Sequence, residues 1–392
     1  MTSRDIFKNE VREVLIENIL SFWSEKMFCA EGGFYGAMAS SGELLRDAPR
    51  GAVLNARILW SFSAAYRVLG DENYLRCATH AKEYLLKHFC NADRGTICWS
   101  VDCNGMPKDT KNQFYALGFA IYALSEYNRA TGDDEALEQA KILFCSIEEH
   151  SYIAESNGYI EACREDWSEI EDLRLSEKDD NAPLTMNTHL HILEAYTNLY
   201  RVWQSDEVKV SLARLINIFI DKIYNSATGH LSLFFDMEWR RLDGIYSYGH
   251  DIEASWLLLE AAQVLGDSVV IKRVMPIVKR VAEASKEGLR ADGSMIYERH
   301  ADGTLDTDCH WWVQAECVVG LMWLAEFHND TQAEAEAIKC WEYIKAQIID
   351  HEGGEWWWSR REDGSINMKE DKAGMWKCPY HNSRMCLEIL NL

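Results

Sequence analysis

The stretch Gly229-His230-Leu231-Ser232-Leu233-Phe234 decides the fold, because segments of the same kind recur along the chain. In each, a glycine is followed within a few positions by aromatic or branched apolar residues, a pattern that favours a tight turn leading into a short strand. Successive glycines lie 61 to 71 residues apart. The chain is therefore predicted to contain six copies of one structural unit. The other five copies begin at Gly33, Gly95, Gly158, Gly293 and Gly354.

The segments between these glycines have the 3.6-residue periodicity of helices, and the 392 residues include only 5 prolines. Second turns follow several of the glycines, for example at Asn104-Gly105 and Asp302-Gly303, and we interpret each pair of turns as a short β-hairpin. Each repeat is thus predicted to hold a helix, a hairpin-bearing loop and another helix. The twelve predicted helices are Ile6–Lys26, Ala52–Leu69, Glu72–Phe89, Asn112–Thr131, Asp134–His150, Leu184–Val202, Asp206–Tyr224, His250–Leu265, Ser268–Lys286, Trp311–Phe327, Thr331–Ile349 and Tyr380–Leu390.

Six helical hairpins can stack as an open solenoid or close into a ring. An open solenoid places polar caps on its terminal repeats, whereas the last repeat here is rich in tryptophan (Trp356, Trp357, Trp358 and Trp376). This difference favours closure. We predict an all-α fold, an (α/α)6 barrel that forms one domain over residues 1–392, with short β-hairpins in the loops at the active-site end.

The composition excludes several classes of partner. A formal net charge of −23 argues against nucleic acid and anionic membranes, and no apolar run is long enough to span a membrane. The first nine residues are polar, unlike a signal sequence, and the 12 cysteines are scattered without a C-x-x-C pair. His189-x-His191 is weak evidence for a metal site. We expect a cytoplasmic monomer with reduced thiols, no metal and no cofactor.

In a closed ring, the helices that follow the β-containing loops all begin at the same end of the barrel, so the residues in their first turns should converge. Aromatic faces together with fixed polar groups suit a carbohydrate site. Taken singly, each residue also has a structural interpretation, such as a core tryptophan, a buried ion pair or a helix cap. The converging residues are Asn55 and Arg57, Tyr115, Asn187 and His191, His250 and Glu253, Trp311, Trp312 and Glu316, and His381 with Arg384.

The types of residue in this set bear on the reaction. His250 and Glu253 lie three positions apart on one helix face, where the carboxylate could orient the imidazole. Two imidazoles on opposite faces of a substrate suit proton transfer at neutral pH. A glycoside hydrolase would need paired carboxylates, which Asp251, Glu253 and Glu316 could supply, so a hydrolase is an alternative. A sugar-binding repeat protein without activity is another.

At these residues the chain resembles the N-acylglucosamine 2-epimerase family, and within it the cellobiose 2-epimerases. The resemblance extends from about Gly32 to the C-terminus. The motifs that carry it are Val53-Leu54-Asn55-Ala56-Arg57-Ile58-Leu59-Trp60, Thr185-Met186-Asn187-Thr188-His189-Leu190-His191, Ser247-Tyr248-Gly249-His250-Asp251-Ile252-Glu253, Trp311-Trp312-Val313-Gln314-Ala315-Glu316 and Trp376-Lys377-Cys378-Pro379-Tyr380-His381-Asn382-Ser383-Arg384-Met385.

The resemblance implies reversible inversion at C2 of the reducing-end glucose of a β-1,4-linked disaccharide, cellobiose to glucosyl-mannose or lactose to epilactose. After ring opening, a C2 proton is removed, a cis-enediolate forms, and the other face is reprotonated. His250 and His381 would be the two acid–base groups, with Glu253 orienting His250. Arg57 and His191 would stabilise the enediolate oxygens.

The resemblance also implies how the sugar is held, without metal or redox cofactor. Tyr115 and Asn187 would bind hydroxyl groups near C1 and C2. Trp312 would lie against the reducing-end sugar and Trp376 would stack on the other one. Trp311 and Glu316 complete the predicted substrate-binding set. A 2-epimerase or aldose–ketose isomerase acting on free mannose or glucose is the alternative closest to this function.

Overall fold

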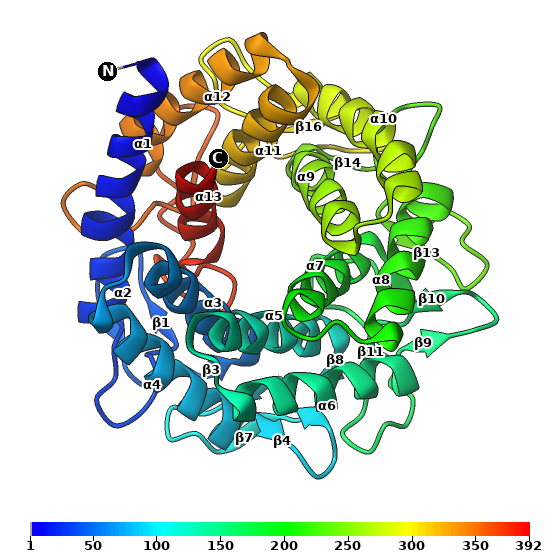
Figure 1. Cartoon of the computed structure of the whole chain (residues 1–392). Helices are drawn as coiled ribbons and strands as arrows, with labels where there is room; N and C mark the ends of the chain where they lie inside the picture. The colour runs from blue at the N-terminus through cyan, green and yellow to red at the C-terminus, as the bar shows by residue number, and fades with distance from the viewer. Residues whose placement is uncertain (1) are drawn as a thin grey trace.

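The computed structural model describes residues 2–392 and shows helices arranged in two concentric rings (Figure 1). Each inner helix contacts the next one along the chain, and α13 also contacts α3, which closes the inner ring. The predicted (α/α)6 barrel is confirmed. The six inner helices are α3 (Ala52–Leu69), α5 (Phe114–Thr131), α7 (Met186–Val202), α9 (Tyr248–Leu265), α11 (Trp311–His328) and α13 (Tyr380–Asn391).

The outer ring pairs one helix with each inner helix. Five outer helices follow their inner partners directly and pack against them: α4 (Glu72–His88), α6 (Asp134–His150), α8 (Asp206–Ile218), α10 (Ser268–Ser285) and α12 (Thr331–Tyr343). The sixth outer position belongs to α1 (Ser3–Glu13), which continues through the π-helical η1 (Val14–Leu20) into α2 (Ser21–Glu25). Helix α1 packs against α13, so the two ends of the sequence complete the sixth pair.

Burial explains which helices are inside. Inner helix α11 buries almost all of its residues from Trp311 to Leu324, whereas outer helix α12 buries one stripe (Ala333, Ala337, Cys340 and Trp341). A short turn joins each of the first five inner helices to its outer partner. At α3, Gly70 ends the helix with φ of 73°, and the Asp71 side chain caps the first turn of α4. Short elements extend three outer helices: η2 (Phe219–Ile223), η3 (Lys286–Gly288) and η4 (Ile344–Ile348).

Short strands fill the longer loops at the other end of the barrel. Within one loop, β4 (Cys90–Asn91) pairs with β5 (Thr96–Ile97) next to Gly95, and β6 (Ser100–Val101) pairs with β7 (Pro107–Asp109) around Gly105. The two turns of a loop therefore close two separate hairpins, and the prediction that each pair of turns forms one hairpin is wrong. The reason is that Gly95 and Gly105 both have positive φ (66° and 83°), so each reverses the chain on its own. Similar pairs are β1 (Ala37–Met38) with β2 (Leu44–Leu45), β9 (Tyr152–Ile153) with β10 (Gly158–Tyr159), and β15 (Glu298–Arg299) with β16 (Leu305–Asp306).

A second set of strand pairs joins neighbouring repeats. The strand immediately before each of five inner helices pairs antiparallel with the loop of the next repeat, and a bridge between Met38 and Ala373 joins the last loop to the first. These pairs fix where the inner helices begin: the first amide of α3 donates to the Trp99 carbonyl, and that of α11 donates to the Trp358 carbonyl. The five pairs are β3 (Arg50–Gly51) with β6, β8 (Asn112–Gln113) with β11 (Ala162–Cys163), β12 (Leu184–Thr185) with β13 (Phe234–Phe235), β14 (Tyr246–Ser247) with β15, and β17 (Cys309–His310) with β18 (Ser359–Arg360).

Helices α3, α11 and α13 begin at the predicted residues, whereas α5, α7 and α9 each begin two residues away from the prediction. Helix α9 begins at Tyr248, so Gly249 lies inside its first turn instead of ending the preceding loop. A Cβ atom at Gly249 would lie 2.6 Å from the Trp312 ring. The glycine is therefore explained by close packing between α9 and α11, which the local sequence does not reveal.

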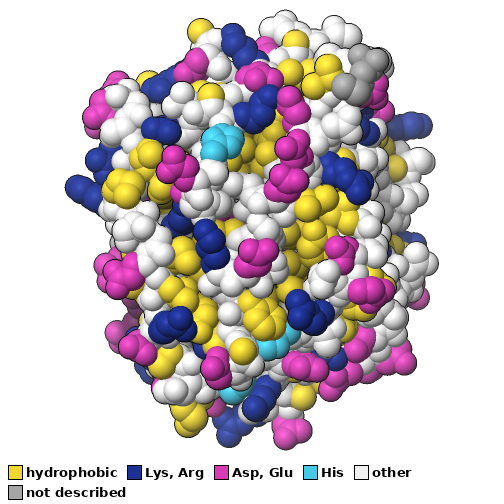
Figure 2. Space-filling view, turned by 90° about the vertical axis from the view of Figure 1, so that its left-hand side faces the viewer, with side chains coloured by type: hydrophobic (Ala, Val, Ile, Leu, Met, Phe, Trp, Pro, Cys, Tyr) yellow, Lys and Arg dark blue, Asp and Glu magenta, His cyan; other side chains and the backbone are white. Residues whose placement is uncertain are grey.

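The surface is mixed in character. On the face drawn in Figure 2, acidic, basic and hydrophobic side chains are interspersed. Within residues 2–392, every helix is too short or too polar to cross a membrane.

Candidate active site

The predicted site residues lie at the β-containing end of the barrel, in the first two turns of the inner helices or, for Trp376, in the loop before α13. Arg57, Tyr115, His191 and His381 are buried. Four others are half-buried: Asn187, His250, Trp312 and Trp376. The site thus combines buried charged groups with aromatic and polar groups that solvent can reach.

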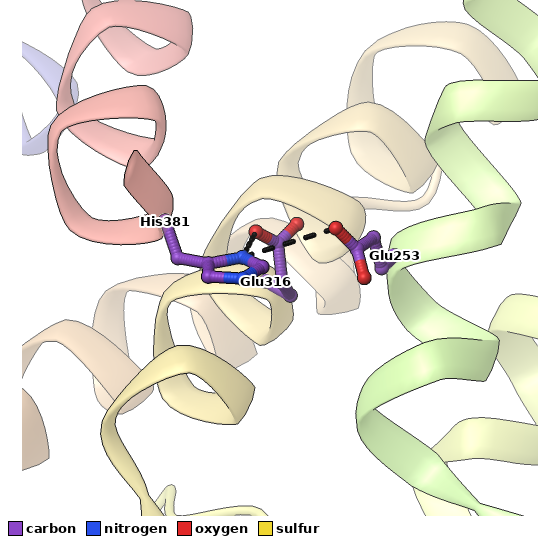
Figure 3. A group of neighbouring side chains, drawn as sticks. All are labelled: Glu253, Glu316 and His381. Atoms are coloured by element: carbon purple, nitrogen blue, oxygen red, sulfur yellow. Dashed lines mark hydrogen bonds and ion pairs between the residues drawn. The ribbon is translucent and has the colours of Figure 1, made fainter. Parts of the chain in front are cut away.

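His381 is held by carboxylates from two other helices. Its Nδ1 lies 2.6 Å from Glu316 Oε1 on α11 and 3.8 Å from Glu253 Oε1 on α9. Figure 3 shows these three side chains pointing toward one another. Since a carboxylate can only accept, Glu316 keeps the proton on Nδ1 and leaves Nε2 as the basic nitrogen.

Arg384 lies one turn beyond His381 on α13 and connects the carboxylates. Its Nη2 donates to Glu253 Oε1 at 2.5 Å and to Glu316 Oε1 at 2.6 Å, and its Nη1 donates to Glu194. Glu194 in turn lies 2.9 Å from Nδ1 of His191. A single buried guanidinium therefore links the partners of two histidines on different helices.

The group formed by Glu253, Glu316 and His381 could by its chemistry hold a metal ion, because its ligand atoms lie within 4.8 Å of one another. However, Arg384 Nη2 is hydrogen-bonded to both carboxylates and so takes the position that a cation would need. The donor set fits the guanidinium, and chemistry without a metal stays our prediction.

His250 is held differently from His381. Its Nδ1 lies 2.8 Å from the Ser247 hydroxyl, while Glu253 bonds to Arg384. The prediction that Glu253 orients His250 is wrong, because the His250 side chain bonds to Ser247, the residue just before α9, and Glu253 bonds to Arg384. The Trp312 ring lies beside both histidines, with centroid distances of 4.9 Å to His250 and 5.5 Å to His381.

Arg57 occupies the α3 side of the site. Its Nη2 donates to the Tyr115 hydroxyl at 2.9 Å, and its guanidinium carbon lies 4.2 Å from the centroid of the Phe119 ring. Tyr115 also forms T-shaped ring pairs with His191 and Trp376, at centroid distances of 4.9 and 5.9 Å. Arg57, Tyr115, His191 and Trp376 are therefore brought together as predicted.

Burial sets the protonation of these groups. Burial lowers the pKa of His381 well below its usual value, and the Arg57 and Arg384 cations lower it further. Burial also lowers the pKa of His191 and His250. Both catalytic candidates are thus neutral at neutral pH and able to accept a proton.

The pKa values of the three buried carboxyl groups are shifted in different directions. Burial alone would raise the pKa of Glu194, but Arg384 and the hydrogen bond from His191 outweigh it and lower the pKa to about 2. Burial, together with repulsion from Glu316, raises the pKa of Glu253 to about 8. Burial also raises the pKa of Glu316.

Two residues predicted to bind substrate have other contacts. Trp311 is 1% exposed and packs its ring against His381 at a centroid distance of 5.4 Å. The oxygens of Glu316 are taken by His381, Arg384 and the Trp256 indole. Both residues contact His381, and their binding of a sugar stays a prediction. Asn187, in contrast, has a buried Oδ1 without a partner among the described residues.

Sequence reasoning missed Glu194 and gave no role to Ser247, to Arg384 or to Tyr380, whose hydroxyl donates to Glu194. A signal for Glu194 was present, since His191-x-x-Glu194 has the same spacing as His250-x-x-Glu253. The histidine–glutamate contact predicted for the second pair is made by the first, at 2.9 Å.

The fold and site define a class: an (α/α)6-barrel protein with histidines, an arginine and buried carboxylates gathered where the inner helices begin. The sequence model of the family described as N-acylglucosamine 2-epimerase (GlcNAc 2-epimerase) matches residues 33–384. The chain belongs to this family.

Individual relatives cover almost the whole chain. The cellobiose 2-epimerase of Bacteroides fragilis is 54% identical over 388 residues, covering 98% of this chain and 99% of the relative. That of Ruminococcus albus is 38% identical over 383 residues, covering 97% and 98%. Among solved structures, cellobiose 2-epimerase from Bacillus thermoamylovorans superposes with a TM-score of 0.95 at 40% identity and 99% coverage of both chains.

Proposed function

We propose that the protein catalyses reversible epimerisation at C2 of the reducing-end glucose of cellobiose and related β-1,4-linked disaccharides. The observation that carries the proposal is the pair His250 and His381, which belong to different helices and both lie beside the Trp312 ring. The identity of 54% with a cellobiose 2-epimerase supports this choice of substrate.

The reaction begins with opening of the reducing-end ring, which exposes an aldehyde at C1 and makes the C2 proton acidic. One histidine removes this proton and becomes an imidazolium, and a cis-enediolate forms. The other histidine takes up a proton from solvent and, as an imidazolium, delivers it to the opposite face of C2, while the first histidine returns its proton to solvent. Glu316 stabilises the charge that His381 gains, because its carboxylate accepts the hydrogen bond from Nδ1.

Arg57 and His191 stabilise the enediolate oxygens. Arg57 is already positioned by the Tyr115 hydroxyl and the Phe119 ring, so it needs little reorganisation when negative charge develops. Trp312 lies against the reducing-end sugar, Trp376 stacks on the non-reducing one, and the unpartnered Oδ1 of Asn187 accepts from a sugar hydroxyl.

Geometry disfavours the glycoside hydrolase alternative. A hydrolase needs two carboxyl groups that flank the scissile bond. Here Glu253 and Glu316 bond to the same nitrogen of Arg384, so both approach a substrate from one side. Asp251 accepts hydrogen bonds from His230 and from the Leu231 amide and is occupied in holding a loop.

Proton NMR of cellobiose incubated with the protein in D₂O tests the proposal. Epimerisation predicts mannose-type reducing-end signals with deuterium at C2, whereas hydrolysis would release glucose. Deuterium appearing at C2 of free mannose, with cellobiose unchanged, would favour the monosaccharide alternative. Replacing His381 by Ala should abolish the exchange, and His328→Ala, at the opposite end of α11, should not. Cellobiose and mannose both left unchanged by the wild-type protein would refute the proposal.

A further inference from the structure

Three buried carboxyl groups surround one cation in the site. Glu194, Glu253 and Glu316 are each at most 2% exposed, and all three bond to Arg384. His381 does not balance the charge, because burial and the nearby arginines lower its pKa. If all three carboxyls were ionised, Arg384 and the nearby buried Arg57 would leave one buried negative charge without compensation, which is strongly unfavourable. One of the three must therefore hold a proton.

The hydrogen bonds indicate which one. Glu316 accepts at both oxygens, from His381, Arg384 and Trp256. Glu194 also has partners at both oxygens, namely Arg384 and the Tyr380 hydroxyl at Oε1 and His191 at Oε2. Donors aimed at both oxygens favour the ionised form.

Glu253 differs from the other two carboxyls. It accepts one hydrogen bond, from Arg384 to Oε1, and no donor in the described part of the chain reaches Oε2. Its Oε2 is therefore free to carry the proton and donate it. The carboxyl is also close to the reacting groups, since Oε1 is 3.8 Å from Nδ1 of His381 and the residue lies one turn beyond His250.

We propose that Glu253 is a neutral carboxylic acid whose Oε2–H donates a hydrogen bond to the sugar oxygen on which negative charge develops. This inference rests on the proposed function and assigns Glu253 a role in it. A neutral donor stabilises the enediolate without adding a negative charge that would oppose it. The raised pKa of Glu253, about 8, agrees with this state.

Substitution by glutamine tests the role in catalysis. In Glu253→Gln the amide carbonyl still accepts from Arg384 and the NH₂ group replaces the O–H donor, so kcat should stay within about tenfold of the wild type. Glu253→Leu removes the donor and should lower kcat by about 10²–10³-fold. Glu316→Gln removes a required anion and should also lower kcat by about 10²-fold or more. An equal loss in Glu253→Gln and Glu316→Gln would overturn the proposal.

Infrared spectroscopy tests the protonation state without reference to turnover. At neutral pH the wild type should show a carboxylic acid C=O band that shifts in D₂O and is missing from Glu253→Gln. A band missing from Glu316→Gln instead, or unchanged in Glu253→Gln, would overturn the proposal. Because the band needs no substrate, the protonation of Glu253 can be established or refuted even if the protein proves not to epimerise cellobiose. Thermal unfolding of each variant shows whether it is folded.

Discussion

Ser247 offers a sharp test of how His250 is held. Serine at the residue before a helix usually caps it, but in α9 this side chain makes no capping hydrogen bond and lies 2.8 Å from His250 Nδ1 instead. A hydroxyl can both donate and accept, so it can hold the imidazole whichever ring nitrogen carries the proton. We expect Ser247→Ala to impair catalysis while leaving the stability of α9 almost unchanged.

The size of the effect follows from this one contact. A neutral hydrogen bond contributes about 1 ± 0.5 kcal/mol. Since about 1.4 kcal/mol corresponds to a factor of ten in rate, kcat should fall about two- to twelvefold. KM should change less, because the hydroxyl positions His250 and is not required to touch the sugar.

Initial rates with cellobiose and the rate of deuterium entry at C2 measure the effect. Ser255→Ala is the matched control: Ser255 is also buried on α9, but its hydroxyl donates to the Ile252 carbonyl. In contrast to alanine, Ser247→Asp should shift the acid limb of the pH profile upward, because a carboxylate stabilises the imidazolium. Equal rates for Ser247→Ala and the wild type, or an equal loss in Ser255→Ala, would refute the reasoning.

Three further predictions concern other parts of the site. Trp376→Ala should raise KM for cellobiose about two- to twelvefold by removing a stacking surface, and turnover of free mannose, if any, should not change in parallel. The pH profile of kcat/KM should be bell-shaped. Its acid limb lies below pH 6.5 because the pKa of His381 is lowered, and its alkaline limb lies near the Glu253 pKa of about 8, above which the neutral acid is lost. A value of kcat/KM that does not change between pH 7 and pH 10 would contradict this prediction. Arg384→Met leaves buried carboxylates unpaired and should lower the free energy of unfolding by about 3–5 kcal/mol in denaturant titrations. The control Arg4→Met breaks an exposed ion pair and should lower it by about 0–1 kcal/mol. Similar losses of unfolding free energy in the two variants would count against the buried network.

The barrel could be predicted from sequence because its signals are local and repeated. The glycine turns at 61- to 71-residue intervals reveal the number of units, and the closed ring then places the first turns of the inner helices together. Arg57, His191, His250 and His381 were located by that argument alone, because each lies within the first two turns of an inner helix.

The partners of these residues were not predictable in the same way. Arg384 meets Glu194 across 190 positions of sequence and Glu253 across 131, and which inner-ring side chains touch depends on the width of the ring. The sequence pattern of His250 and Glu253 suggested a contact between these two residues along one helix, whereas His250 bonds to Ser247 and Glu253 bonds to Arg384 on α13. Gly249 shows the same limit, since the Trp312 ring that requires it belongs to α11.

The strand pairs between repeats determine which loops can be exchanged with those of a relative. Strand β14, directly before α9, is paired with β15 in the loop before α11, so a transplanted loop would bring in a strand that has to fit a foreign partner. Hairpin tips are free of this constraint: open space surrounds Gly303 and Gly364, although the positive φ of both positions (86° and 78°) still favours glycine there. Attempts to widen the range of accepted sugars should therefore vary the tips and keep each strand together with its partner from the neighbouring repeat.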